Sequence, residues 1–318
     1  MSEILFVKTS SLGDLIHNMP ALMDARRHRP DARFTWIVEE MYLPLMRFHP
    51  HIDNLVPVAW RRWRRQLHRP QTWAEIAAFW RAIRARRYEA VIDSQGLIRS
   101  ALIACCVSGV RHGYDADSIR ERAASSLYNV THHVGPWLEG HVIARNRQLT
   151  ALALGYTVSG PPDYGLDRVR IAASPRAPYA LIVHGSARAS KEWPEQSWKR
   201  IAEQLSDRGL NVVLLWGNAA ERARSERIGE GLPNAEVPPL RPVDEVTRLI
   251  AGAAIVVGGD TGFTHIAAAL GTPTIAIFIS TSPKIAEAMG PGPVANIYRG
   301  GTPPDVADVE TAISKLLV

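Results

Sequence analysis

The chain has 318 residues, 46% of them hydrophobic, which suits about two domains of roughly 100 to 200 residues each and excludes a mainly disordered protein. Lys and Arg number 37 against 31 Asp and Glu, a formal net charge of +6. Residues 61–87 hold nine arginines and one acid, so this segment carries +8 and the remainder −2. One basic segment on a nearly neutral chain predicts an anionic partner or surface met at a single place.

The cysteines, the first residues and the apolar runs indicate the compartment of the protein and its contact with membranes. Cys105 and Cys106 are adjacent in an apolar stretch, which predicts packing residues in a reducing compartment and not a disulfide framework. Residues 1–8 run directly into a strand-like pattern without the features of a signal peptide. The longest apolar runs, such as residues 251–257, fall well short of the ~20 residues that span a bilayer. Any membrane contact is expected to be peripheral.

The first half alternates short β-rich runs with longer amphipathic segments. Strands are predicted at residues 4–8, 33–38, 54–58 and 90–93, and helices at 15–28 and 73–87. Strand and helix patterns that alternate at this spacing indicate a parallel sheet with crossover helices.

The same pattern restarts in the second half. Strands are predicted at residues 179–184, 211–216, 254–257 and 274–278, and helices at 195–207, 220–231, 243–252, 263–270 and 306–317. Residues 159–163 read SGPPD, a composition typical of a linker. We therefore expect an α/β fold with two Rossmann-like halves facing a central cleft.

The loop after the first strand, residues 8–14, offers a candidate catalytic group. Small residues and a glycine allow a ligand to approach the backbone, and Asp14 stands at the start of the next helix. Asp14 is either a helix-start acid stabilised by the dipole or a general base. The loop has neither the P-loop nor the GxGxxG spacing, which argues against ATP hydrolysis and NAD chemistry.

Three segments of the second half have residues suited to a nucleotide. Residues 258–265 combine two glycines, hydroxyls and a helix start, which suits a pyrophosphate. Ser186 and Lys191 follow a predicted strand and could hold phosphate oxygens. Glu221 could accept hydrogen bonds from ribose hydroxyls, although it could equally be an exposed helix acid.

Several motifs together carry a resemblance to a known family. They read KTSSLGD at 8–14, RRWRR at 61–65, VIDSQGL at 91–97, HGSARASKEWP at 184–194, WGNAAE at 216–221 and DTGFTH at 260–265. Over essentially its whole length the chain resembles the bacterial lipopolysaccharide heptosyltransferases, and most closely those that add the first heptose.

The resemblance implies an inverting, metal-independent glycosyltransferase of GT-B fold that uses no cofactor. Its acceptor domain would span residues 1–162 and its donor domain 163–304, with a final helix, 305–318, packing back on the first domain. The donor would be ADP-L-glycero-β-D-manno-heptose. The acceptor would be the inner Kdo of Kdo2-lipid A, reached at the cytoplasmic face of the inner membrane of a Gram-negative bacterium by a peripheral protein, with a monomer favoured.

The resemblance also assigns site residues. Asp14 matches the catalytic base. The expected donor contacts are Ser186, Ala187, Lys191, Glu221, Arg241, Asp260, Thr261, Gly262 and His265. The expected acceptor contacts are Lys8, Ser11, Gly13, Arg61, Arg62, Arg64, Arg65 and Arg120, since arginine binds phosphates and carboxylates bidentately.

The sequence departs from the family at two places and leaves two rival functions open. A Thr-Thr pair is replaced by Ser186-Ala187, and a Lys-Met pair near the adenine by Leu240-Arg241. One rival is a heptosyltransferase for another acceptor, a second or later heptose or a protein. The other is a non-enzymatic binder of RNA or anionic membrane, which has no use for Asp14 or the DTGFTH loop, and we expect no nucleic-acid partner.

Overall fold

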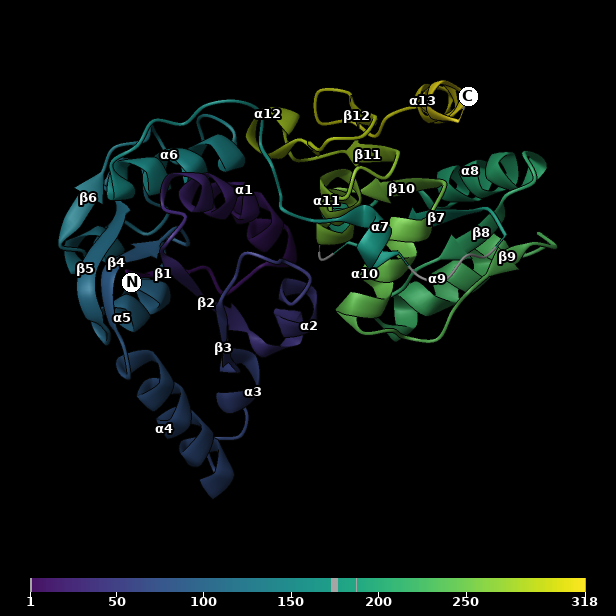
Figure 1. Ribbon diagram of the computed structural model, residues 1–318. Coiled ribbons are helices and arrows are strands. Elements are labelled where there is room, and N and C mark those ends of the chain that lie inside the picture. The colour runs from purple at the N-terminus through teal and green to yellow at the C-terminus, as the bar shows by residue number, and fades with distance from the viewer. Residues whose placement is uncertain (1, 173–176, 187, 318) are drawn as a thin grey trace. The chain divides into compact units, whose positions relative to one another are not determined.

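The computed structural model describes residues 2–172, 177–186 and 188–317, and these form two compact units, Met1–Gly165 and Leu166–Val318. Each unit contains one six-stranded parallel sheet with helices packed against it (Figure 1). Two α/β units of Rossmann type, as the sequence predicts, are thereby confirmed.

The first sheet has the strand order β3-β2-β1-β4-β5-β6, with every pair parallel. Its strands are β1 (Glu3–Val7), β2 (Arg33–Glu39), β3 (Asn54–Val58), β4 (Arg87–Asp93), β5 (Ser108–Tyr114) and β6 (Val130–His132). Its helices are α1 (Leu12–His28), α2 (Leu43–Met46), α3 (Trp60–Trp63), α4 (Pro70–Arg84), α5 (Ile98–Cys105) and α6 (Val142–Leu154), with 3-10 turns η1 (Glu40–Tyr42) and η2 (Arg122–Leu127). The strand order reverses between β1 and β4, the position where open α/β sheets bind ligands.

The second sheet has the order β12-β11-β10-β7-β8-β9, again parallel throughout. Its strands are β7 (Tyr179–Val183), β8 (Asn211–Leu214), β9 (Ala235–Glu236), β10 (Ile255–Gly259), β11 (Thr274–Phe278) and β12 (Val294–Tyr298). Its helices are α7 (Arg168–Ile171), α8 (Glu195–Asp207), α9 (Ala219–Gly229), α10 (Val243–Gly252), α11 (Gly262–Ala269), α12 (Pro283–Ala286) and α13 (Val306–Leu316), with the 3-10 turn η3 (Ala189–Lys191). Here the order reverses between β7 and β10.

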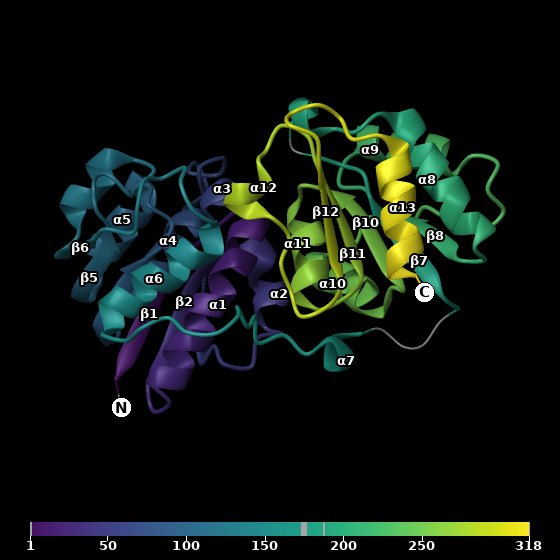
Figure 2. The same ribbon diagram turned by 90° about the horizontal axis from the view of Figure 1, so that it is seen from above.

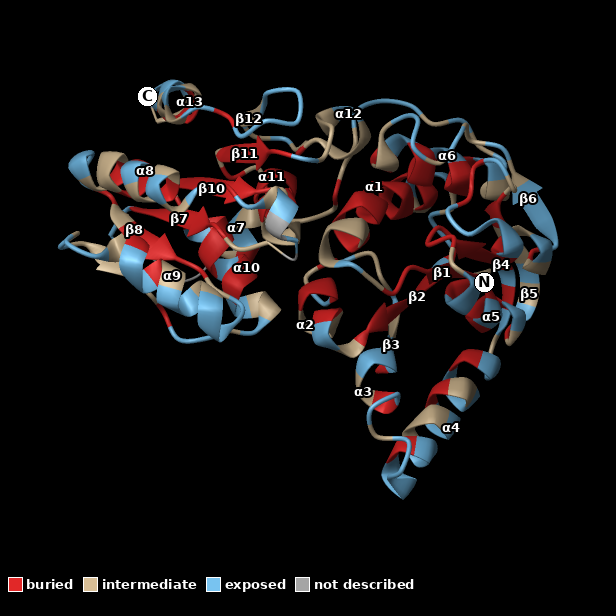
Figure 3. Cartoon of the chain, turned by 180° about the vertical axis from the view of Figure 1, so that it is seen from behind, coloured by how far each residue is buried: buried red, intermediate tan, exposed pale blue. Residues whose placement is uncertain are grey.

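The central strands are buried on both faces, which explains their continuous apolar runs. In β1 the residues Ile4, Leu5, Phe6 and Val7 have no exposed surface, and Figure 3 shows the middle of each sheet buried. The strands that the sequence missed are β5, β6, β9 and β12, which lie toward the edges. The sequence of β5, SGVRHGY, has neither an apolar run nor a clean alternation.

The boundary between the units follows Gly165, three residues beyond the predicted one. Asp163 pairs with Arg27, and Gly165, at φ +65°, lies so close to Met23 and His49 that a side chain would clash. These contacts hold the linker to the first unit up to Gly165. On the other side Arg168 donates hydrogen bonds to three carbonyl oxygens of the second unit.

The C-terminal helix corrects a second expectation. α13 packs on α8, β11 and β12 of the second unit, and Figure 2 shows it beside α8. Its Val309, Ala312 and Ile313 belong to the second hydrophobic core. Trp193 Nε1 donates to the Pro304 carbonyl at 2.9 Å and fixes the segment that leads into the helix. The predicted packing of residues 305–318 on the first domain is therefore wrong, because the apolar face of α13 is buried here.

Candidate active site

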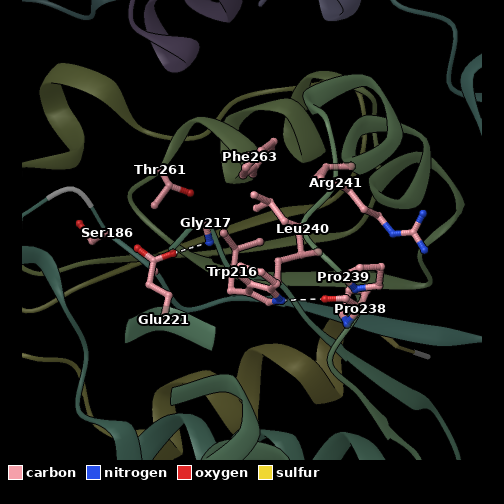
Figure 4. Close-up of a pocket in the computed structure, with 14 residues that line it drawn as sticks. Ser186, Trp216, Gly217, Glu221, Pro238, Pro239, Leu240, Arg241, Thr261 and Phe263 are labelled. Carbon is pink, nitrogen blue, oxygen red and sulfur yellow. Dashed lines mark hydrogen bonds between the residues drawn. The ribbon is translucent and has the colours of Figure 1, made fainter. Parts of the chain in front are cut away.

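A pocket of about 250 Å³ opens at the carboxyl ends of the strands of the second sheet. Its lining comes from the residues after β7 and β8, from the starts of α9 and α11, and from the segment before α10 (Figure 4). The expected donor residues Ser186, Glu221, Arg241 and Thr261 line it. Ala187 lies outside the described residues. Loops distant in sequence meet here because β7 and β10 flank the point where the strand order reverses.

Glu221 forms the polar end of this pocket. Its Oε2 accepts a hydrogen bond from the Gly217 N–H at 2.7 Å, and its Oε1 accepts one from the Asn218 side chain at 2.8 Å. Asn218 in turn caps α9, accepting from the Glu221 N–H at 3.0 Å. A Cβ at Gly185 would lie 2.7 Å from the Glu221 carboxylate, so a side chain there would displace the carboxylate. The carboxylate is thus held in place to accept hydrogen bonds from vicinal hydroxyls.

The opposite wall of the pocket is apolar. Trp216, Leu240 and Phe263 project toward one another in Figure 4. Trp216 Nε1 donates to the Pro238 carbonyl at 2.7 Å, which fixes the indole ring. This wall suits the flat face of a nucleobase. Trp216 and Phe263 lie within the WGNAAE and DTGFTH motifs. The sequence alone did not predict that either side chain lines the site.

Arg241 lines the pocket, but its charged end faces away from Glu221. Its guanidinium points away from Glu221 in Figure 4 and pairs with Glu245 at 2.8 Å, one helical turn further along. The residue lines the pocket, but its charge is already partnered. The adjacent Leu240 is 60% exposed and presents an apolar side chain to the cavity.

A charged cluster lies where β10 leads into α11. The Asp260 carboxylate contacts Lys191 Nζ at 2.5 Å and His265 Nε2 at 3.3 Å. Burial by itself would raise the pKa of Asp260, but the hydrogen bonds from His265 and Lys191 outweigh it and hold this pKa well below its usual range. Asp260 is therefore a carboxylate that positions Lys191 and His265.

α11 begins at Gly262 beside this cluster, with Thr261 at its N-cap. The first N–H groups of a helix have no partner within it and carry partial positive charge. Thr264 Oγ1 donates to the Gly259 carbonyl at 2.6 Å and packs where a Cβ at Gly258 would clash. The glycines therefore bring strand and helix close together, and a cation and a helix start lie beside the pocket.

Asp14 lies in the first unit, after β1 and in the first turn of α1. Its Oδ2 accepts hydrogen bonds from the Ser11 N–H at 2.8 Å and the Ser11 hydroxyl at 2.7 Å. The side chain is only partly buried. These contacts are those of a helix-start acid, and they also orient a carboxylate at the reversal point of the first sheet.

Lys8 is a buried residue and not an exposed ligand. It is 5% exposed, and its Nζ donates to the Ser94 carbonyl at 2.6 Å. Burial lowers the pKa of Lys8, while the charges of Asp14 and Asp93 oppose that shift. The expected acceptor contact by Lys8 thus has a competing partner, and the residue links the ends of β1 and β4.

A hydrogen-bond network behind the Asp14 loop was not assigned from the sequence. Gln95 Oε1 accepts from the Thr9 N–H at 2.7 Å and the Thr9 hydroxyl at 2.8 Å. Asp93 accepts from the Tyr128 hydroxyl at 2.9 Å. These buried groups fix the start of the Asp14 loop against β4. The DSQG run was noticed as a motif, but its partner on β1 could be found only in three dimensions.

The arginines of the RRWRR segment fall into two kinds. Arg62 pairs with Glu40 at 2.9 Å and Glu75 at 2.8 Å, so it joins α3 to η1 and α4. Arg61, Arg64 and Arg65 are exposed, and no ion pair among the described residues engages them.

Arg120, the remaining expected acceptor contact, is also exposed. Its guanidinium lies over the Trp137 ring, 6.0 Å from the centroid.

Two Rossmann-type units, one with a nucleotide-sized pocket and the other with an oriented carboxylate, have the architecture of a glycosyltransferase of the GT-B class. The model of glycosyltransferase family 9 (heptosyltransferase) matches residues 76–306. The chain therefore belongs to glycosyltransferase family 9.

Individual relatives cover nearly the whole chain. Lipopolysaccharide heptosyltransferase 1 of Pseudomonas aeruginosa is 42% identical over 291 residues, 91% of this chain and 81% of the relative. The same enzyme of Escherichia coli K12 is 38% identical, with 91% of each chain covered. The structure of E. coli heptosyltransferase WaaC with ADP superposes with a TM-score of 0.91 at 35% identity, covering 99% of both chains.

Proposed function

We propose that this protein transfers L-glycero-D-manno-heptose from ADP-L-glycero-β-D-manno-heptose to the inner Kdo of Kdo2-lipid A, with inversion at the anomeric carbon. The pocket of the second unit carries the proposal, because it joins an apolar wall for a base to a fixed carboxylate, Glu221, for ribose hydroxyls. The relatives named heptosyltransferase 1 and the ADP complex of WaaC support this choice of donor and reaction.

The donor diphosphate needs positive charge as it leaves. Lys191 and the N–H groups at the start of α11 supply it, while Asp260 holds Lys191 near the pocket. When the diphosphate binds, Lys191 turns from Asp260 to the phosphate oxygens. Stabilising developing charge with fixed donors is the largest catalytic contribution in many enzymes.

The acceptor hydroxyl needs a base. Its oxygen bonds to the anomeric carbon of the heptose while the bond from that carbon to the diphosphate breaks, and ADP leaves with the electron pair. Asp14 takes the hydroxyl proton, held in orientation by Ser11. No covalent enzyme intermediate and no cofactor are needed.

The acceptor also carries phosphates and carboxylates, which the exposed Arg61, Arg64, Arg65 and Arg120 bind. Arg62 instead maintains this surface through Glu40 and Glu75. The protein acts as a monomer at the cytoplasmic face of the inner membrane, where its acceptor lies. No helix among the described residues is long and apolar enough to cross a bilayer.

A transfer assay read by mass spectrometry tests the proposal. ADP-heptose is offered with Kdo2-lipid A, and in parallel with an acceptor that already carries one heptose. We expect one heptose to be added to the first acceptor only. Transfer to the second acceptor alone would assign the protein to a later step, and no transfer together with salt-sensitive RNA binding would refute the enzyme proposal.

The same assay tests metal independence. Among the described residues, no group of three or more His, Cys, Asp or Glu side chains is arranged to hold a metal ion. The proposed reaction uses no metal ion, because Lys191 and the start of α11 supply the positive charge that the leaving diphosphate needs, so transfer should survive full chelation with EDTA. Loss of transfer that is restored by Mg²⁺ would contradict this expectation.

A further inference from the structure

A second cavity, of about 350 Å³, lies in the first unit between β3, α3 and α4. Its surface is mostly apolar, formed by Val56, Pro57, Trp63, Ala78, Phe79 and Ala82. Trp63 and Phe79 are buried beneath it, whereas Ala78 and Ala82 are exposed along α4. We call this cavity the α3–α4 groove. Its small residues on one wall leave space that the described side chains do not fill.

The N-terminal end of α4 carries exposed apolar side chains. Trp73 is 57% exposed and Leu67 47% exposed, and Trp73 Nε1 donates to the Leu67 carbonyl at 2.8 Å, which fixes the indole at the surface. In Figure 3 this end of α4 extends beyond the sheet with few buried residues. Exposed apolar surface of this kind commonly marks an interaction site.

The charge around the groove selects an anionic partner. Its acids, Glu40 and Glu75, are both paired with Arg62, and Trp63 Nε1 also donates to Glu75 at 2.8 Å. The same basic segment, residues 61–87, carries Arg64, Arg65, Arg69 and Arg81, which are exposed and which no ion pair engages among the described residues. The partner should thus combine an anionic part with an apolar part. A nucleic acid would leave the apolar groove unused.

We propose that the α3–α4 groove binds one acyl chain of the lipid acceptor while the anionic head of the same molecule lies on the neighbouring arginines. The inference rests on the proposed function, since it specifies how that acceptor is held. The cavity of about 350 Å³ gives room for part of one chain. Trp73 and Leu67 then meet the interfacial layer from which the chain is drawn, where indole rings are favoured.

The test compares two acceptors that differ only in their acyl chains. Kdo2-lipid A in phosphatidylglycerol vesicles is set beside its fully deacylated counterpart, and KM is measured for each. Ala82→Trp fills the groove, and Ala77→Trp adds the same indole to an exposed position of α4 outside it. Ala78→Leu is a milder filling variant in case Ala82→Trp fails to fold.

Filling the groove should raise KM for the acylated acceptor by roughly tenfold, because apolar surface of the chain stays in water. KM for the deacylated acceptor should change less than twofold, and Ala77→Trp should change neither value. An equal rise for both acceptors, or none for the acylated one, would overturn the inference. So would a matching loss of binding to vesicles without acceptor, which would make a membrane phospholipid the occupant. If the unmodified protein heptosylates neither acceptor, the proposed function fails instead.

Discussion

The two units share one plan of sheet but differ in charge and in how their sites are built. The first unit has 21 Lys and Arg against 15 Asp and Glu, whereas the second has 16 of each. The second unit encloses a pocket whose walls are fixed by internal hydrogen bonds. The first presents the Asp14 loop, exposed arginines and the α3–α4 groove. Two six-stranded parallel sheets of the same plan thus carry a preformed pocket in the second unit and an open cationic surface in the first.

Removal of the proposed base in the first unit should lower turnover most strongly while leaving the pocket of the second unit intact. Asp14→Asn keeps the size of the side chain and can still contact Ser11, but it cannot accept the hydroxyl proton. We expect turnover to fall by roughly 10² to 10⁴, the usual contribution of a general base. ADP affinity, measured by calorimetry, should stay the same because the pocket lies in the other unit. Unchanged turnover would remove Asp14 from the mechanism.

Substitutions in the first unit should distinguish the arginines without ion pairs, which affect acceptor binding, from Arg62, which affects stability. Arg64→Glu with Arg65→Glu should raise KM for the acceptor by at least about tenfold, since two charge-assisted contacts become repulsive, and leave ADP affinity unchanged. Arg62→Ala should mainly lower the melting temperature, because it releases Glu40 and Glu75.

Steady-state kinetics and thermal unfolding measure the two effects. If Arg62→Ala raised KM for the acceptor while stability stayed the same, Arg62 would belong among the acceptor contacts.

In the second unit, Gly185→Ala should weaken ADP binding by roughly tenfold, since the new Cβ would displace the Glu221 carboxylate and disturb hydrogen bonds of about 1 kcal/mol each. Arg241→Ala is the matched comparison from the same pocket. Its charge is paired with Glu245 and points away, so ADP affinity should change less than twofold. Calorimetric titration with ADP decides, and a larger loss for Arg241→Ala would restore it as a donor contact.

The smallest effect concerns stability and pH. The pKa of Asp260 is lowered on folding, so its contribution to stability is full above the ordinary aspartate pKa of about 3.9. It is lost as pH falls below that value toward the lower folded pKa. Relative to Asp260→Asn, the unmodified protein should be more stable by about 1 kcal/mol at pH 6, with a smaller difference at pH 3.5.

Denaturant unfolding of both proteins at the two pH values measures this difference. A difference that grows on acidification would contradict a lowered pKa.

Sequence patterns predicted strands and the site loops after them best where a strand is buried on both faces. β1, β7 and β10 read as continuous apolar runs, and the polar loops after them contain Asp14, Ser186 and Thr261. β5, which lies next to the edge strand β6, and the edge strand β12 are partly exposed, lack that signal and were missed. The predicted packing of α13 was wrong, because the sequence of an amphipathic helix shows that it has an apolar face but not which core buries that face.

The two α/β units, the basic segment in the first of them and the loops that could hold a nucleotide can all be recognised in the amino-acid sequence. Local periodicity and spacing suffice for this, since each feature is contained in a few consecutive residues. Which of the charged side chains lack an ion-pair partner becomes visible only in the folded chain. Arg62, Lys8 and Arg241 find partners far from them or one helical turn away, while Arg64 and Arg65, in the same basic segment as Arg62, remain exposed. Whether a charge can bind a ligand depends on its neighbours in space, and the order of residues alone does not give them.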